Sequence, residues 1–170
     1  MPQGIAIVGL NGSGKTTLGR ALAERLEYFR IDVEDYYFPK SDVPYAVART
    51  RDEVERMMLA DIEKHGDFVL SAVCADFASI EKYYSLVVYL EAPKEERMER
   101  IRRRSIDRFG ERVLSGGDMY EQEESFFAFA AKRTPDKIEK WIENVSCPII
   151  RIDSRKPTDE LVTDILKYNK

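Results

Sequence analysis

The residues whose types and spacing most directly indicate chemistry lie near the start of the chain. Residues 9–16 read Gly-Leu-Asn-Gly-Ser-Gly-Lys-Thr and match the pattern GxxxxGK[ST] in full. Glycines at this spacing let backbone N–H groups turn inward around phosphate oxygens, and the N-terminus of a following helix adds favourable partial charge. Lys15 can reach the β- and γ-phosphates, and the Thr16 hydroxyl can hold Mg²⁺. The motif predicts a nucleoside triphosphate site that uses Gly9, Asn11, Gly12, Ser13, Gly14, Lys15, Thr16 and Thr17.

Three candidate catalytic acids, Asp32, Glu34 and Asp35, end or follow an apolar segment at 28–33. Transfer of a phosphoryl group to a hydroxyl needs a carboxylate that orients the hydroxyl or takes its proton, and a second carboxylate can hold magnesium through water. The apolar segment 68–73 offers no acid at its end, so we expect Thr16 and Asp32 to hold the metal. Alternate residues of a strand share a face, which predicts that Asp32 and Glu34 point together into a cleft. The same acids would also suit a solvated turn.

Arginines recur every three or four residues between 97 and 108, so they line one face of a single helix. A row of guanidinium groups beside a phosphate site can stabilise charge on a transferred group. The alternative is a solvated face paired with the glutamates at 95, 96 and 99, and we expect this for Arg97, Arg102 and Arg103. The candidate catalytic arginines are Arg100, Arg104 and Arg108.

Around these residues, short apolar runs alternate with helical stretches, which predicts an α/β domain with a mainly parallel sheet. We expect strands at 4–9, 28–33, 68–73, 85–90 and 149–152, and helices at 15–27, 51–64, 93–108 and 158–166. Glycines at 110, 116 and 117 would give the Arg-rich segment between the last two strands flexible points. We expect one domain over 1–170 with an inserted mobile lid at about 105–125.

Composition narrows the function classes. The chain has 170 residues with 27 Lys and Arg against 31 Asp and Glu, a net charge of −4, which argues against an extended nucleic-acid surface. Neither a membrane-spanning apolar run nor a secretory signal is visible. With two distant cysteines and one histidine, disulfides and histidine-based metal sites are not expected. These features predict a cytoplasmic protein that does not bind membranes.

On these motifs the chain resembles the small-molecule and nucleotide kinases of the phosphate-loop class, such as shikimate, gluconate, adenylate and nucleoside kinases. The resemblance implies a three-layer P-loop NTPase fold, with a parallel five-stranded sheet in the order 2-3-1-4-5 and an Arg-rich lid. It also implies ATP and Mg²⁺ as cofactors, and ATP-dependent phosphoryl transfer to a small-molecule acceptor, for which we favour a nucleoside or nucleotide. The alternative is a nucleotide-binding switch with slow hydrolysis and a protein partner.

The resemblance also suggests roles for single residues. Residues 31–34 resemble the DxD element of shikimate kinases, which implies that Asp32 supports magnesium and Glu34 faces the acceptor. Residues 34–37 equally resemble the DDFY element of uridine kinases, which would make Asp35 the critical acid. Similarity to the adenylate kinase pattern places Arg100 on the adenine and Arg104 on phosphate.

Two further regions complete the expected site. Residues 153–157 are similar to the loop that holds adenine in these kinases, which adds Arg155 and Pro157 to the nucleotide contacts. Aromatic and basic residues between 36 and 51, Lys40, Tyr45, Arg49 and Arg51 among them, would suit an acceptor with an anionic group. An aromatic loop that merely covers the sheet edge is the alternative for this region.

Overall fold

A computed structural model of the chain describes residues 1–39 and 48–169. Within these residues, five parallel strands form one sheet in the order β2-β3-β1-β4-β5, which confirms the expected order. The strands are β1 (Gly4–Val8), β2 (Phe29–Asp32), β3 (Phe68–Ala72), β4 (Tyr84–Glu91) and β5 (Ile149–Asp153).

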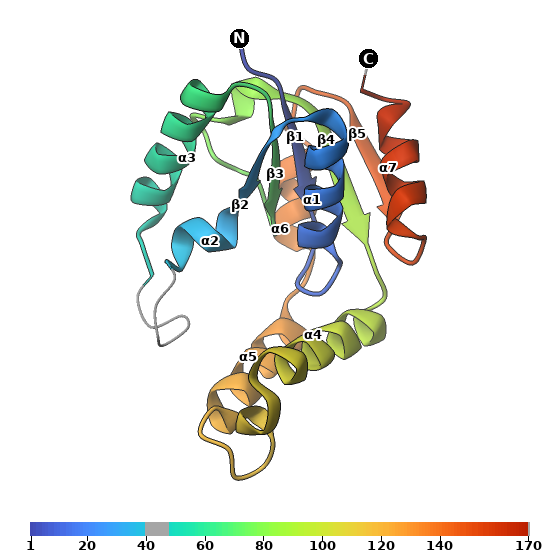
Figure 1. Ribbon diagram of the computed structural model, residues 1–170. Helices are drawn as coiled ribbons and strands as arrows, with labels where there is room; N and C mark the ends of the chain where they lie inside the picture. Colours follow the sequence, from blue (N-terminus) through green and yellow to red (C-terminus); the bar gives the residue numbers. More distant parts are fainter. Residues whose placement is uncertain (40–47, 170) are drawn as a thin grey trace.

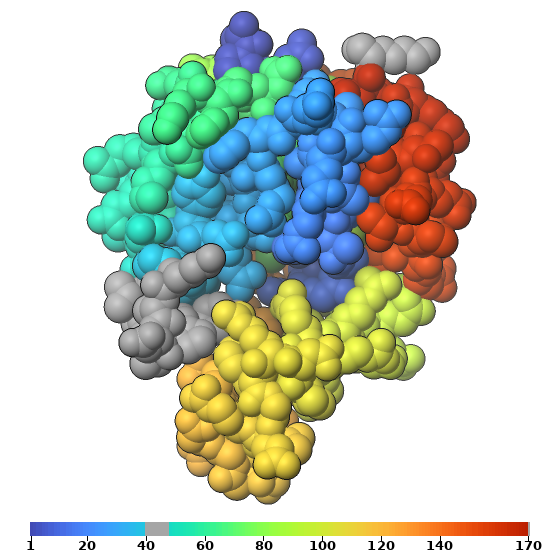
Figure 2. All heavy atoms as spheres, in the orientation of Figure 1, coloured from blue at the N-terminus to red at the C-terminus, as the bar shows by residue number. Residues whose placement is uncertain are grey.

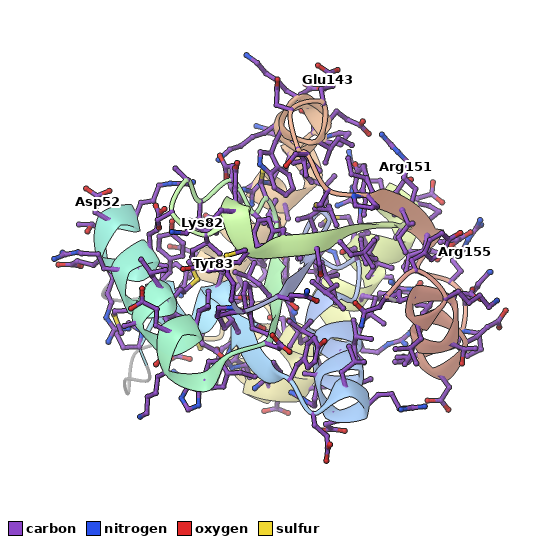
Figure 3. All side chains as sticks on the ribbon, turned by 90° about the horizontal axis from the view of Figure 1, so that it is seen from above. Asp52, Lys82, Tyr83, Glu143, Arg151 and Arg155 are labelled. Carbon is purple, nitrogen blue, oxygen red and sulfur yellow. The ribbon has the colours of Figure 1, made fainter. Side chains whose placement is uncertain are left out.

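Helices cover both faces of the sheet and so form three layers. They are α1 (Lys15–Leu26), α2 (Val33–Tyr37), α3 (Arg51–His65), α4 (Lys94–Phe109), α5 (Tyr120–Lys132), α6 (Asp136–Ile142) and α7 (Thr158–Leu166), with 3₁₀ turns η1 (Glu81–Tyr83) and η2 (Gly110–Val113). Viewed from above, α1 and α7 lie on one side of the sheet and α6 on the other (Figure 3). In residues 1–39 and 48–169, every helix is too short or too polar to cross a membrane.

The first strand shows how the sequence produces these layers. All five residues of β1 are buried, as expected for a central parallel strand that is covered on both faces. Ile5 and Ile7 pack in an apolar cluster with residues of α1 and α7. Ala6 and Val8, which alternate with them, pack in a second cluster with residues of α3 and α6. Because the five strands are parallel, their carboxyl ends meet at one edge of the sheet, and α4 and α5 lie beyond that edge (Figure 1).

The sequence prediction is wrong just after β2. We expected strand alternation to continue through Glu34, but β2 ends at Asp32 and α2 begins at Val33. The Asp32 side chain causes the change, because it accepts a hydrogen bond of 3.2 Å from the backbone N–H of Glu34 and caps the helix. Glu34 and Asp35 therefore occupy a first helical turn, where acids are favourable, and helical rather than strand geometry sets their directions.

The region expected as a lid, at about 105–125, spans the end of α4, η2 and the start of α5. Ile101 on α4 packs in a small cluster with Phe127 and Ala130 of α5. Beside it, the buried hydroxyl of Ser105 donates a hydrogen bond of 2.8 Å to Glu123. This pair of helices lies below the sheet-bearing body, with a hollowed surface between the two (Figure 2).

Candidate functional site

The loop between β1 and α1 has the form that a phosphate site requires. Gly12 and Gly14 have φ angles of 81° and 96°, in the left-handed region that side chains disfavour. A Cβ atom on Gly12 would lie only 2.4 Å from the backbone oxygen of Arg97, so the loop also packs directly on α4. Glycine at this position meets both demands, and the resulting cradle fits the phosphates of a nucleotide.

Lys15 opens α1 beside this cradle. Its ammonium group donates a hydrogen bond of 3.1 Å to the carbonyl of Leu10 within the loop. Burial lowers the pKa of Lys15 to about 8, although the nearby Asp32 and Glu34 carboxylates oppose the shift. A cation that has lost solvent at this place gains from an incoming anion, as expected of a phosphate-binding lysine.

Thr16 and Asp32 form the candidate metal site. The Thr16 hydroxyl donates a hydrogen bond of 2.8 Å to the Asp32 carboxylate, which brings two hard oxygen ligands together. At the end of β3, Ser71 stands where an acid is missing, and its hydroxyl donates to the backbone oxygen of Lys15 at 3.2 Å. Within the described residues there is no cluster of three or more His, Cys, Asp or Glu that could hold a metal. The Thr16 hydroxyl and the Asp32 carboxylate fit Mg²⁺, which binds few protein ligands and keeps water and phosphate oxygens.

A cavity of about 760 Å³ brings most of the predicted residues together, within the size range of small-molecule sites. Its walls come from the phosphate loop, the end of β2, the residues after β3, and helices α2, α4, α5 and α6. The predicted residues that line it are Asn11, Gly12, Gly14, Lys15, Thr16, Thr17, Asp32, Glu34, Arg100 and Arg104.

Four predicted residues outside the expected adenine loop lie off the cavity wall. Gly9 and Ser13 are buried within the loop and support it from behind. Asp35 is exposed on α2. Arg108 is exposed near the end of α4, where its guanidinium lies 5.0 Å from the ring centre of Phe109.

The expected adenine loop borders a different, smaller hollow. Arg155 lies there beside Arg151 and forms an ion pair of 2.6 Å with Asp153. Figure 3 shows both arginines near β5 and α7. Pro157 occupies the N-cap position of α7. The structure therefore separates Arg155 and Pro157 from the main cavity.

Arg100 connects that loop to the phosphate loop. Its guanidinium donates to the backbone oxygens of Gly12 and Ser13 at 3.3 and 3.2 Å. It also donates to the hydroxyl and backbone oxygen of Ser154, at 3.1 and 3.3 Å. Arg100 therefore lines the cavity and also holds these two loops together.

Arg97 differs from its predicted exposure. We expected a solvated side chain, but Arg97 is 5% exposed. It donates to the backbone oxygens of Asn11 and Ala92 at 3.2 and 3.3 Å. Burial lowers the pKa of Arg97, and one carbonyl group of the phosphate loop and one after β4 take the place of a carboxylate partner. The three-residue spacing between Arg97 and Arg100 was the only feature of the sequence that indicated a place for Arg97 near the phosphate loop.

Sequence reasoning missed Arg133, which follows α5 and lines the cavity. Its guanidinium donates a hydrogen bond of 3.2 Å to the side-chain oxygen of Asn11 and lies 5.4 Å from the ring centre of Phe129. The contact with Asn11 joins residues 122 positions apart, so no local pattern could reveal it.

A charged cluster lies elsewhere on the cavity wall, and sequence reasoning named only its Arg51, as part of the expected acceptor region. Asp76 forms ion pairs with Arg51 at 3.2 Å and with Lys137 at 3.4 Å. Burial raises the pKa of Asp76, but these two cations outweigh it and hold the pKa below its usual value. Aromatic side chains of α2 and α5, Tyr37 and Phe126 among them, flank the same space. An acceptor would therefore meet both apolar surface and charge.

Part of the predicted acceptor region can be placed. Arg49 donates to the backbone oxygen of Tyr36 at 2.9 Å, and the Tyr36 hydroxyl donates to Asp61 of α3 at 2.6 Å. These two residues thus hold α2 against α3 and do not line the cavity. Lys40 and Tyr45 lie outside the described residues.

Comparisons with known proteins show the family to which the chain belongs. A family model described as "AAA domain" matches residues 5–114. The uncharacterized protein YqaC of Bacillus subtilis is 32% identical, over 99% of this chain and 98% of its own length. A shikimate kinase of Enterococcus faecalis is 27% identical, over 88% of this chain and 97% of its own length.

Two solved structures share the fold. A sugar kinase from Janibacter superposes with a TM-score of 0.58 at 14% identity, over 99% of this chain and 94% of that chain. A gluconokinase from Sinorhizobium meliloti superposes with a TM-score of 0.53 at 19% identity, over 98% and 91%.

Proposed function

The chain belongs to the AAA domain family and to the P-loop small-molecule kinase family, and from this premise we propose that it is an ATP-dependent, Mg²⁺-requiring kinase. The observation that carries the proposal is the 2.8 Å contact between Thr16 and Asp32, with Lys15 and Glu34 on the same cavity wall. A phosphate cradle, a metal site and a further acid thus face one space.

The loop and its lysine bind the nucleotide. Backbone N–H groups of residues 12–16 would hold the phosphates, with the charge of Lys15 on the β- and γ-phosphates. Thr16 and Asp32 would hold the magnesium ion. When bound, magnesium-ATP supplies the phosphoryl group that an acceptor hydroxyl takes up.

Glu34 is our candidate for the general base, the carboxylate that takes the acceptor proton. Asp32 is already engaged by Thr16 and by its cap on α2. The Glu34 carboxylate lines the cavity and forms no side-chain hydrogen bond within residues 1–39 and 48–169. Glu34 and Asp35 are both exposed, but Asp35 does not line the cavity. This arrangement favours the shikimate-like assignment of the three acids over the uridine-kinase-like one.

For the acceptor, we propose a broad chemical class. Relatives named for shikimate, sugar and gluconate support a small hydroxylated compound, and the aromatic walls at Tyr37 and Phe126 would also suit a nucleoside or nucleotide. ADP release should be measured with a panel of hydroxy acids, sugars, nucleosides and nucleotides. Strong stimulation by one class supports the kinase. Slow release that no acceptor changes would favour a nucleotide switch.

A further inference from the structure

The cavity holds a group of charges away from the phosphate loop. Asp76, Arg51 and Lys137 form this acceptor-end triad, and they come from the segment after β3, the start of α3 and the start of α6. Besides burial, the main charges that act on the pKa of Asp76 are Arg51 and Lys137. The main charges that act on the pKa of Lys15 belong to other residues, namely Asp32, Glu34, Arg104 and Arg133. The triad therefore lies toward the end of the cavity that the nucleotide phosphates leave for the acceptor.

Arg51 is held in place by the segment after β3. Its guanidinium forms an ion pair of 3.2 Å with the Asp76 carboxylate and donates a hydrogen bond to the backbone oxygen of the same residue. It also lies 4.7 Å from the ring centre of Phe77. One turn along α3, Glu55 accepts hydrogen bonds of 2.7 and 2.6 Å from the backbone N–H and the hydroxyl of Ser79. The sequence suggested that Arg51 meets an anionic group of the acceptor, but the chain itself supplies that anion.

Two further carboxylates line the same cavity. Glu34, the proposed base, must lie beside the acceptor hydroxyl. Glu123 lies one helical turn before Phe126 on the cavity-lining face of α5, and its printed partner is the neutral hydroxyl of Ser105. Within residues 1–39 and 48–169, neither glutamate forms an ion pair. With the triad, three carboxylates thus face two cations around the acceptor, and a further negative charge there would be unfavourable.

We propose that the acceptor is an uncharged compound with several hydroxyl groups, and that Asp76 is the residue that selects it. This inference rests on the proposed function and narrows its acceptor. One acceptor hydroxyl would lie beside Glu34 for phosphoryl transfer, and another would donate to Asp76 and accept from Arg51. A hydroxyl can do both and leaves the ion pair intact. A carboxylate or phosphate would be repelled by Asp76 or would have to break its pair with Arg51.

Sugars and nucleosides share this chemistry, whereas hydroxy acids and nucleotides do not. The wild type tests the charge class with acceptors of matched structure, namely glucitol and gluconate, inositol and quinate, and uridine and uridine monophosphate. ADP release should be measured with each, in the presence of ATP and Mg²⁺. We expect the compound with the highest kcat/KM to be uncharged and to exceed its anionic counterpart by about tenfold or more. Whether it is the polyol or the nucleoside distinguishes the two sources.

Asp76→Asn tests the residue, because asparagine keeps the size of the side chain and removes its charge. We expect the preference for the best neutral acceptor over its anionic counterpart to fall by about 10- to 100-fold. The KM for ATP should change by less than about twofold. Asp52→Asn is the matched control, since Asp52 follows Arg51, is exposed and lies on the outer side of α3 (Figure 3). This variant should match the wild type.

Other outcomes would overturn the inference in distinguishable ways. A hydroxy acid or nucleotide as the best acceptor of the wild type would contradict the charge class, with the proposed kinase intact. An unchanged preference in Asp76→Asn, even with lower activity or lower stability to urea, would make Asp76 a structural support of the segment after β3. A wild type whose ADP release no acceptor stimulates would overturn the proposed function as well.

Discussion

The hydroxyl of Thr16 lies 2.8 Å from a carboxylate oxygen of Asp32, and this contact joins the first turn of α1 to the end of β2. The second carboxylate oxygen of Asp32 caps α2, which carries Glu34. A single aspartate therefore links the phosphate loop to the acid proposed as the base. Disturbing it should affect metal and acceptor together.

Asp32→Asn should weaken the affinity for Mg²⁺ in the presence of ATP by about 10- to 100-fold. Asparagine is still able to cap α2, so the loss reports the missing charge rather than a lost helix. The measurement is ATP affinity as a function of Mg²⁺ concentration. Asp35→Asn is the control, because it makes the same change three residues away on an exposed position. Full magnesium dependence in Asp32→Asn, with loss in Asp35→Asn, would contradict the assignment.

Gly12→Ala should destabilise the protein more than Gly116→Ala. Both glycines have positive φ angles, 81° and 87°, so each alanine costs about 1–2 kcal/mol in backbone strain. Only Gly12 also faces a backbone oxygen, that of Arg97 at 2.4 Å, whereas a Cβ on Gly116 meets open space. We expect an additional loss of about 1–3 kcal/mol in the free energy of unfolding by urea. Equal losses would mean that α4 does not hold the loop.

The parts of the fold that could be predicted depend on neighbouring residues. The loop from Gly9 to Thr16 is a local pattern between an apolar strand and a helix, and resemblance supplied the sheet order. The start of α2 could also have been found, since Asp32 followed by Glu34 and Asp35 is typical of a capped helix.

The rest of the candidate site depends on contacts between distant parts of the chain. Arg97 reaches Asn11 across 86 positions, and Arg133 reaches it across 122. Whether an arginine is solvated or buried against carbonyl groups depends on where α4 and α5 pack. Sequence periodicity defines a helix face but not what that face meets.

Nucleotide affinity should fall as the pH rises through about 8, because that is where Lys15 loses its proton. Burial lowers the pKa of Lys15, so its charge is present below this pH and absent above it. Affinity for ADP with Mg²⁺ should be measured from pH 7.5 to 9.5, where phosphate groups with a second pKa of about 6 are already ionised. Lys15→Met should bind weakly and show no such decline. A wild-type affinity that does not change with pH would contradict a contact between Lys15 and the phosphates.

Nucleotide together with an acceptor should slow hydrogen exchange in residues 110–119. This segment contains η2, and the Arg112–Asp118 ion pair within it is solvent-exposed and therefore weak. In the free protein we expect it to exchange faster than β1. Exchange that is already slow and does not respond to ligands would contradict a closing lid.

The most direct test of the central claim follows the terminal phosphate itself. ATP labelled at the γ-position is incubated with Mg²⁺, the protein and the acceptor that best stimulates ADP release, and the products are separated. We expect label in a phosphoester of the acceptor, with transfer reduced by about 10²- to 10⁴-fold in Glu34→Gln and little changed in Asp35→Asn. Label that appears only as inorganic phosphate, at a rate independent of the acceptor, would contradict the kinase.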